Sequence, residues 1–457
     1  MRSRFGVLAL MRRQDEPAHD FPSFARYLNK GFDLRRHAAG MRDARHNPEI
    51  SPSSVFLALF HSFVFRNPSF QSLERDLKDT YLVDWIGAER PFGDDTLRYS
   101  LCGFDTGPLE DMLVDVNQRL KRSKAFDDGR VQGRLVVAID GIEVLSSFSR
   151  RCEFCSERTV KHKENGYSVK HTQYFHRGVG CQMVHGNVTS FLGFEWQLPG
   201  EGEVSAALRL LDRIEQRYGT RFFDIILLDA LYAQSPVLDR IEQSAWDVVI
   251  SLKQNCPDLY QSAMRLFIHR DPDTIFTERR GHKTYACKIW STEGLPFAER
   301  TGTVRVVRSE EVLCRNRHRD GKLDEFASDH EWCWITTLPQ AQFPPLAVRN
   351  LGHARWKNEN NGWMDLSKHW AFKHGFLHAC HHRPKGIDSQ GNKAPVPNHG
   401  LMAVSFIALI AFSICCAFVQ RHSKLVKRYH FSAIAVAGQL AAWISSPPPR
   451  PVPADDS

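Results

Sequence analysis

Hydrophobic and polar positions follow a helical period in the first part of the chain. Between residues 21 and 126 apolar residues recur at helical spacing, and the stretch 51–65 begins with Ser51 or Ser53 as a candidate cap. Asp94 and Asp95 mark the start of another helix, and the amphipathic stretch 107–126 has a basic C-terminal end. The pattern predicts a small all-helical N-terminal domain over residues 21–130, preceded by a disordered segment, 1–20.

The period changes at Arg134, where short apolar runs replace the helical pattern. Strand-like runs cover residues 134–140, 171–186 and 187–198, and an amphipathic helix over 202–219 then closes on Gly219. Further buried strands are predicted within 222–233 and 247–253, separated by a helix. The order strand, strand, strand, helix, strand, helix, strand predicts an α/β domain that begins over residues 131–254.

The rest of the chain shows three different sequence patterns. Residues 255–340 alternate polar and apolar positions and predict a β-rich insertion in the α/β domain. Helical pattern returns over 341–445, and the Pro-rich end, 446–457, predicts a disordered tail. Within the helical part, residues 401–419 carry no charge, which suits either a buried core helix or a membrane span.

Composition narrows the class of protein. A chain of 457 residues, 42% hydrophobic and 25% charged, can bury a large core, which excludes wholesale disorder. The 60 Lys and Arg exceed the 52 Asp and Glu by 8, a mild basic excess that favours a polyanionic partner. Eleven Cys occur, and the apolar run at residues 5–10 is too short for a secretory signal, so we expect a reducing cytoplasm.

Two acids follow buried strands at equivalent positions. Asp140 ends VVAID and Asp229 ends IILLD, and ligands of an open α/β sheet gather at such strand ends. Each Asp alone could instead cap a turn. Together, two neighbouring carboxylates would repel unless a cation lay between them, and oxygen ligands select Mg²⁺ or Mn²⁺. Glu359 is the candidate third acid and Asp365 its rival.

These residues resemble the bacterial insertion-sequence DDE transposases. The resemblance rests on Asp-Gly after the first strand, LLDALYA in a later strand, a β-rich insertion, and RWKNENNGW on a helix. It implies an RNase H-like catalytic fold in which Asp140, Asp229 and Glu359 form the metal-binding triad, and a DNA-binding or associated role for the helical N-terminal region. Three carboxylates that hold two Mg²⁺ ions suit phosphoryl transfer, which here would be the cleavage and transfer of DNA strands. It also implies double-stranded DNA as partner, both terminal inverted repeats and target DNA, a homodimer in the synaptic complex, no membrane, and a nucleoid-associated location in bacterial cytoplasm.

One cut-and-paste branch of that family carries the signature Tyr, two residues, Arg, three residues, Glu, six residues, Lys. Arg355 and Glu359 keep this spacing, but Gly352 stands in place of the Tyr and Leu366 in place of the Lys. The nearest Lys is Lys368. We expect DNA contacts from basic residues along the chain: Arg355, Lys368, Arg279, Arg280 and Lys253.

Arg355 also has a plainer interpretation, as a solvated i,i+4 partner of Glu359. Trp363 either stacks on a displaced base or lies in the core. The missing Tyr and Lys leave two alternatives to a transposase: a catalytically impaired, transposase-derived DNA-binding protein, or a metal-dependent nuclease.

A possible structural zinc site follows the first Asp. Cys152, Cys155, His171 and His176 have spacing close to that of a zinc site with two Cys and two His. The alternative is two free Cys in a loop and two His on a strand, where residues five apart point to opposite faces. His374 and His378, four residues apart on a predicted helix, are a weaker metal candidate.

Overall fold

The computed structural model describes residues 21–67, 69–164, 167–298, 300, 302–319, 322–358, 362–378, 386–387, 393–394, 399–421 and 433–445. The terminal segments 1–20 and 446–457, for which the sequence predicts disorder, therefore lie outside the described residues.

The N-terminal part is helical, as its apolar period predicts. Ser51 caps the third helix, because its side chain accepts a hydrogen bond from the Ser54 backbone N–H at 3.0 Å. Asp94 begins the sixth helix. The helices are α1 (Phe21–Phe32), α2 (Leu34–Ala39), α3 (Pro52–Val64), α4 (Phe70–Asp79), α5 (Leu82–Ile86), α6 (Asp94–Cys102) and α7 (Gly107–Arg122).

A mixed sheet follows, and its topology is the RNase H-like arrangement. Strand β1 is antiparallel to β3 and parallel to β5, while β4 pairs with β3 and β5 runs parallel to β6, so the order is β4-β3-β1-β5-β6. Gly219 ends α8 with a positive φ of 74°. The elements are β1 (Val136–Ser147), β2 (Ser156–Glu164), β3 (Tyr167–Met183), β4 (Ser190–Trp196), α8 (Glu203–Tyr218), β5 (Ile225–Leu228), α9 (Ser235–Gln243) and β6 (Asp247–Ser251).

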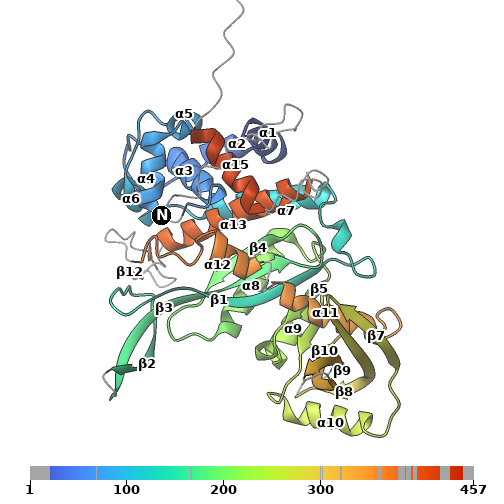
Figure 1. The fold of residues 1–457 in the computed structure, drawn as a ribbon. Helices are drawn as coiled ribbons and strands as arrows, with labels where there is room; N and C mark the ends of the chain where they lie inside the picture. Colours follow the sequence, from blue (N-terminus) through green and yellow to red (C-terminus); the bar gives the residue numbers. More distant parts are fainter. Residues whose placement is uncertain are drawn as a thin grey trace, which may run out of the picture.

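The expectation that the first strand ends at Asp140 is wrong. Strand β1 continues to Ser147, and Asp140 and Gly141 pair with Gly180 and Val179 of β3 instead of forming a turn. The outer half of β3 then pairs with β2, and these long strands form the hairpin that projects from the sheet in Figure 1.

The β-rich insertion continues the same sheet. Strand β10 joins β6 in antiparallel register, and β9, β8 and β7 follow in order. The segment also contains a helix, α10, that the alternating pattern does not predict (Figure 1). Its elements are α10 (Pro257–Phe267), β7 (Thr274–Arg280), β8 (Lys283–Pro296), β9 (Thr303–Arg319) and β10 (Lys322–Thr336).

Helices return after the insertion, but they are shorter than the sequence pattern predicts. The described part of the predicted helical stretch 346–379 contains α11 (Pro345–Asn358) and α12 (Met364–His369), and residues 371–378 form turns and bends. His374 and His378 therefore do not share a helix face. The remaining elements are β11 (Gly386–Ile387), β12 (Lys393–Ala394), α13 (His399–Arg421) and α15 (Ala433–Ser445).

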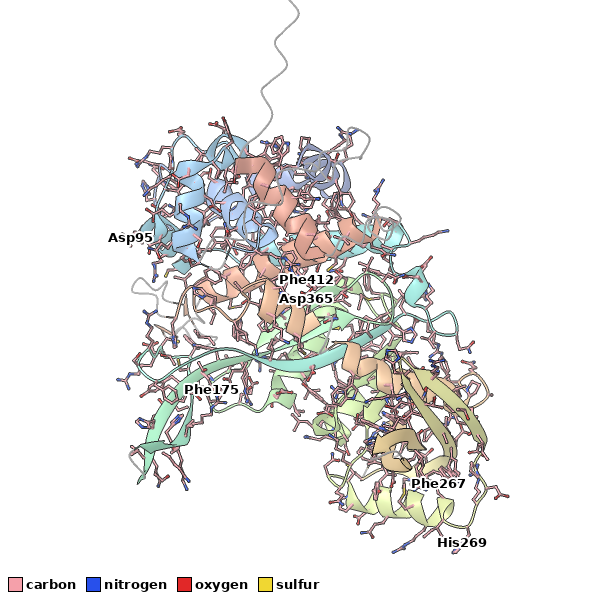
Figure 2. The ribbon with its side chains drawn as sticks, viewed as in Figure 1. Asp95, Phe175, Phe267, His269, Asp365 and Phe412 are labelled. Carbon is pink, nitrogen blue, oxygen red and sulfur yellow. The ribbon has the colours of Figure 1, made fainter. Side chains whose placement is uncertain are left out.

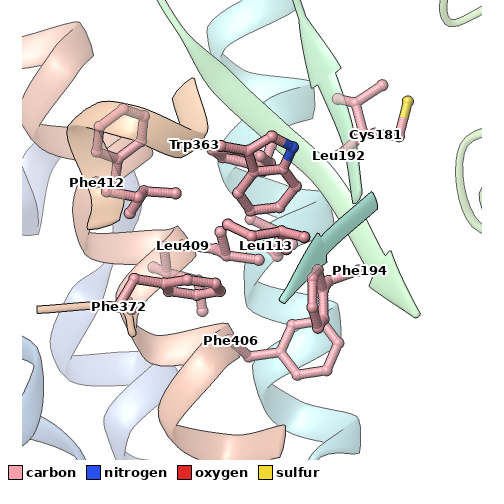
Figure 3. Packing of buried hydrophobic residues seen from close by; sticks show 14 of the residues in the cluster. Leu113, Cys181, Leu192, Phe194, Trp363, Phe372, Phe406, Leu409 and Phe412 are labelled. Carbon is pink, nitrogen blue, oxygen red and sulfur yellow. The ribbon is translucent and has the colours of Figure 1, made fainter. Parts of the chain in front are cut away.

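The apolar helix α13 lies between the N-terminal helices and the sheet. It packs against α3, α6 and α7 on one side and against β4 on the other (Figures 1 and 3). Ile407, Leu409 and Phe412 are fully buried. The buried Ser413 hydroxyl donates a hydrogen bond to the Leu409 carbonyl at 2.8 Å, so its polar group has a partner within the helix. Among the described helices it alone is long and apolar enough to cross a membrane, and 78% of its apolar window is buried within the protein.

One continuous hydrophobic core runs from the first helix to the last. It includes Phe21 of α1, Val137 of β1, Leu210 of α8 and Leu440 of α15. The division of the chain into separate N-terminal, catalytic and insertion domains stays a prediction, and the helical layer is completed by residues from both ends of the sequence.

We expect the buried His61 of α3 to make folding stability depend on pH. Its ring bonds with the Leu57 carbonyl and accepts from the Trp85 indole N–H, and burial lowers its pKa to about 4. Unfolded His titrates near 6.5, so this stability is complete above that pH and falls as the pH drops toward 4, by at most about 1.4 kcal/mol per pH unit.

The measurement is urea denaturation at several pH values between 7.5 and 4.5. The His61→Gln variant should show a flatter dependence than the wild-type chain, whereas His269→Gln, at an exposed position, should retain the wild-type slope (Figure 2). Identical slopes for His61→Gln and wild type would contradict the expectation.

Candidate active site

The sheet brings Asp140 and Asp229 to the same level. In the parallel pairing of β1 with β5, Ala138 lies opposite Leu227. Asp140 comes two residues after Ala138, still within β1, and Asp229 comes two residues after Leu227, just beyond the end of β5. Side chains two residues apart share a face of a strand. The predicted pair is therefore neighbouring in space because of strand register, although Asp140 lies within β1 and Asp229 follows the end of β5.

Arg355 of α11 bridges the two carboxylates. Its guanidinium lies 3.5 Å from Asp140 Oδ2 and 3.8 Å from Asp229 Oδ1, and the Lys253 ammonium lies 3.8 Å from the same Asp229 oxygen. Helix α11 packs on β1, β5 and β6, which carries Arg355 to this edge of the sheet. The side chain of Arg355 is 10% exposed, so the plainer interpretation of it as a solvated helix-surface residue is wrong.

The aspartate pair lies in an open cleft. The cleft has a volume of about 550 Å³, and α12 with the segment after it contributes Lys368 and Lys373 to its wall. Lys368, one of the expected DNA contacts, thus lines the same cleft as the two aspartates. The complete lining is Asp140, Gly141, Ile142, Glu143, Asp229, Arg355, Trp363, Met364, Ser367, Lys368 and Lys373.

A further carboxylate, Glu203, adjoins the pair. It begins α8, accepts a hydrogen bond from the Tyr232 hydroxyl at 2.8 Å, and fills the space beside Gly141, where a Cβ would lie 2.3 Å from its carboxyl group. The sequence shows this residue only as an acid in the first turn of a helix, a common position, so nothing in the spacing identified it.

These surroundings raise the pKa of Asp140 to about 6. Burial is the main cause, Arg355 opposes it, and the negative charges of Glu203 and Asp229 add to it. The Tyr232 hydroxyl stays protonated because burial and Glu203 raise its pKa well above the ordinary value. The site therefore has a surplus of negative charge that a bound cation would stabilise.

The oxygen atoms present fit a divalent cation. Asp229 Oδ1 is buried and accepts no hydrogen bond from the described residues, although two cationic groups lie 3.8 Å from it. Carboxylate oxygens are the ligands of Mg²⁺ and Mn²⁺. Asp140 and Asp229 would hold such an ion, with Glu203 close by.

The sequence offers two candidates for the third acid, Glu359 and Asp365, and the structure describes only Asp365. Glu359 lies outside the described residues. Asp365 does not belong to the described lining of the cleft; instead, burial raises its pKa, and it interacts with Arg66 beside α13 (Figure 2). Asp365 is thus separated from the aspartate pair.

Comparison with family models gives a match to the transposase DDE domain over residues 132–365. The chain belongs to this family. The match runs from just before β1 to the start of α12 and includes the insertion, Asp140, Asp229 and Arg355. No curated protein matches significantly. Among solved structures, the piggyBac transposase in a synaptic complex with hairpin DNA is similar at 10% identity, with a TM-score of 0.39, over 95% of this chain and 82% of that one.

Two departures of this DDE-family chain from the signature have a packing cause. Gly352 lies on α11 against Trp334 of β10, and a Cβ there would be 2.1 Å from the indole Nε1. No Tyr fits at this position. Leu366, in place of the signature Lys, is fully buried, and Lys368 reaches the cleft instead.

Trp363 belongs to the core, so base stacking is excluded in this arrangement. It is 4% exposed, its ring lies 4.6 Å from that of Phe191, and it covers Gly180 of β3 (Figure 3). Trp363 also belongs to the lining of the cleft, but its ring is almost fully covered by protein.

The two arginines of β7 lie in different surroundings. Arg279 is exposed and donates to the Gly281 carbonyl at 3.2 Å. Arg280 pairs with Glu278 at 2.7 Å and with the buried Glu311 at 2.9 Å. Arg280 thus has its charge balanced within the insertion, and neither arginine lines the cleft described above.

The structure changes the ligand set that the cysteine spacing predicts. Cys152, Cys155 and His176 lie together with His378, and all four donor atoms are within 4.8 Å of one another. His171 lies apart, in ring contact with Phe148 and His162, because it points to the other face of β3. The sequence could not show His378 as the fourth member, since it lies 202 positions after His176.

We expect Gly352→Ala to lower the free energy of unfolding by about 1–3 kcal/mol, because the added methyl group would overlap the buried Trp334 ring. Thermal or urea unfolding measures this. The matched control is Gly438→Ala on α15, where nothing lies within 4 Å of the added Cβ. That control should be neutral or gain up to about 1 kcal/mol, and equal losses at both positions would contradict the packing explanation.

Proposed function

We propose that this chain is a DNA transposase that cleaves and joins DNA strands at the ends of an insertion sequence, with two divalent metal ions held by Asp140, Asp229 and Glu359. Family membership supports transposition on DNA. The observation that supports the metal-dependent mechanism is that Asp140 and Asp229 lie at equivalent positions of paired strands, in a cleft that is also lined by lysines.

The chemistry of such a site is phosphoryl transfer. Bound Mg²⁺ or Mn²⁺ would activate the attacking oxygen and stabilise the leaving one. Asp140 and Asp229 supply the charge that holds the ion, and a bound cation would lower the pKa of Asp140, which burial raises to about 6. No side chain serves as nucleophile in this proposal, so water and then a DNA 3′-hydroxyl attack the phosphate.

The cationic groups of the cleft would bind the DNA backbone. Arg355 and Lys253 neutralise the aspartates when no metal is bound, and a metal ion would free them to contact phosphates. Lys368 and Lys373 already face the cleft. We include Arg279 and Arg280 of the insertion as end contacts, with Arg280 contributing less because Glu278 and Glu311 balance it.

The wider setting follows from this activity. Terminal inverted repeats and target DNA would be the substrates, and joining two ends requires a synaptic complex, for which we propose a homodimer. We also propose that the protein acts in the bacterial cytoplasm, associated with the nucleoid.

The catalytic assignment is tested with DNA that carries the element's terminal repeats, in Mg²⁺. Asp140→Asn, Asp229→Asn and Glu359→Gln should each reduce strand cleavage to background and leave end binding largely intact, because each removes a metal ligand. Asp365→Asn is the matched control and should cleave like wild type, since Asp365 is not among the residues that line the described cleft.

Three other outcomes of the cleavage assay would each change the assignment. Cleavage by Asp140→Asn at the wild-type rate would overturn the site. A wild-type chain that binds the ends without cutting would support the catalytically impaired alternative. Cutting that ignores the end sequence would support a nuclease.

The DNA contacts are tested by the salt dependence of binding. Lys368→Ala should weaken binding to all sequences and reduce the slope of log affinity against log salt by about one, as expected for one lost phosphate contact. Lys163→Ala removes an exposed lysine of the β2 hairpin outside the cleft lining and should leave the slope unchanged. Equal slopes for wild type and Lys368→Ala would exclude Lys368 as a phosphate contact.

A further inference from the structure

We propose that Cys152, Cys155, His176 and His378 bind a structural Zn²⁺ ion that ties the wall of the active-site cleft to the sheet. Each of the four side chains offers one donor atom to a common centre. The Cys152 sulfur lies 3.2 Å from His176 Nε2, and the Cys155 sulfur lies 3.4 Å from His176 Nε2 and 3.0 Å from His378 Nε2.

The separation of the two sulfur atoms fits two ligands of one ion and excludes a disulfide. They lie 3.7 Å apart, whereas a disulfide bond is about 2.05 Å long. Tetrahedral zinc with Zn–S near 2.3 Å and Zn–N near 2.0–2.1 Å places neighbouring ligand atoms roughly 3.3–3.8 Å apart. The sulfur–sulfur separation and the 3.4 Å separation of Cys155 from His176 lie within that range, and the separations of 3.2 Å and 3.0 Å are shorter.

The chemistry of the four donors selects zinc over the ion proposed for the aspartates. Two thiolates and two imidazoles form the tetrahedral set typical of structural zinc, whereas Mg²⁺ and Mn²⁺ prefer oxygen. Four protein ligands leave no open position for a substrate. Cys155, His176 and His378 are buried, so the site has the closed, inner position of a structural ion.

The ligands come from three segments that are distant in sequence. Cys152 and Cys155 lie in the connection between β1 and β2, His176 lies on β3, and His378 ends the described segment that follows α12. His176 pairs with Leu145 of β1 in the sheet register. An ion here would therefore link the β1–β3 pair to the chain that follows α12.

That last segment matters because it forms part of the cleft. Lys373 lines the cleft beside Asp140, and Gly375 packs so closely on Leu145 that a Cβ would lie 2.9 Å from it. Residues 371–378 form turns and bends, and the buried side chains of Phe372, Phe376 and Leu377 anchor them in the core. The zinc ion would add a second anchor at His378 and so help to keep Lys373 in the cleft wall.

The test measures the metal content of the full-length chain, without DNA and without any activity assay. Purified protein should contain about one zinc per chain by elemental mass spectrometry, and exchange with cobalt(II) should give the visible absorption of a tetrahedral thiolate site. His378→Ala should lose most of the bound metal. His171→Ala is the matched control and should retain it, because His171 lies outside the cluster.

The opposite pattern, with metal lost from His171→Ala and kept by His378→Ala, would overturn the proposal. So would zinc-free wild-type protein, or a Cys152–Cys155 disulfide found by mass spectrometry. If His378→Ala does not fold, His378→Cys keeps a zinc ligand and should give soluble protein with metal. Asp140→Asn should also retain zinc, so the result is independent of the proposed transposase activity.

Discussion

The burial of α13 is the interaction on which the rest of the structure depends. A 23-residue helix with almost no polar surface gains free energy wherever it is removed from water, and here it is enclosed by helices from the N-terminal part and by β4. Because α13 comes late in the chain, the N-terminal helices cannot complete their core until the whole α/β part is made. The helical layer and the sheet therefore share one core from Phe21 to Ile444.

The sheet positions the site by register and helix packing. Parallel pairing of β1 with β5 sets Asp140 level with Asp229, and α11, packed across the same strands, brings Arg355 between them. Arg355 and Lys253 offset the charges of the two aspartates when no metal is bound, while Glu203 leaves the site with a surplus of negative charge. This partial neutralisation lets a partly buried pair of carboxylates exist in a folded protein, since an unpaired buried charge would cost several kcal/mol.

Packing also explains why α11 and α12 depart from the signature. Trp334 occupies the space that a side chain at position 352 would need, and Leu366 fills the core where a lysine would be buried without a partner. Lys368, two positions further along α12, reaches the cleft instead. A cationic group thus reaches the aspartates from a neighbouring position of the same helix.

The sequence by itself determined the elements and the chemistry that depend on local pattern. Helical period, the Ser51 cap and the short apolar runs identified the helices and strands, and Asp140, Asp229 and Arg355 followed from those positions and the resemblance. Only the tertiary structure decided which residues meet across long separations. Glu203 beside Gly141, His378 beside Cys155, and Asp365 directed to Arg66 depend on packing between distant segments. Spacing along a chain constrains neighbours within one element, whereas contacts between elements follow from how their buried faces fit together.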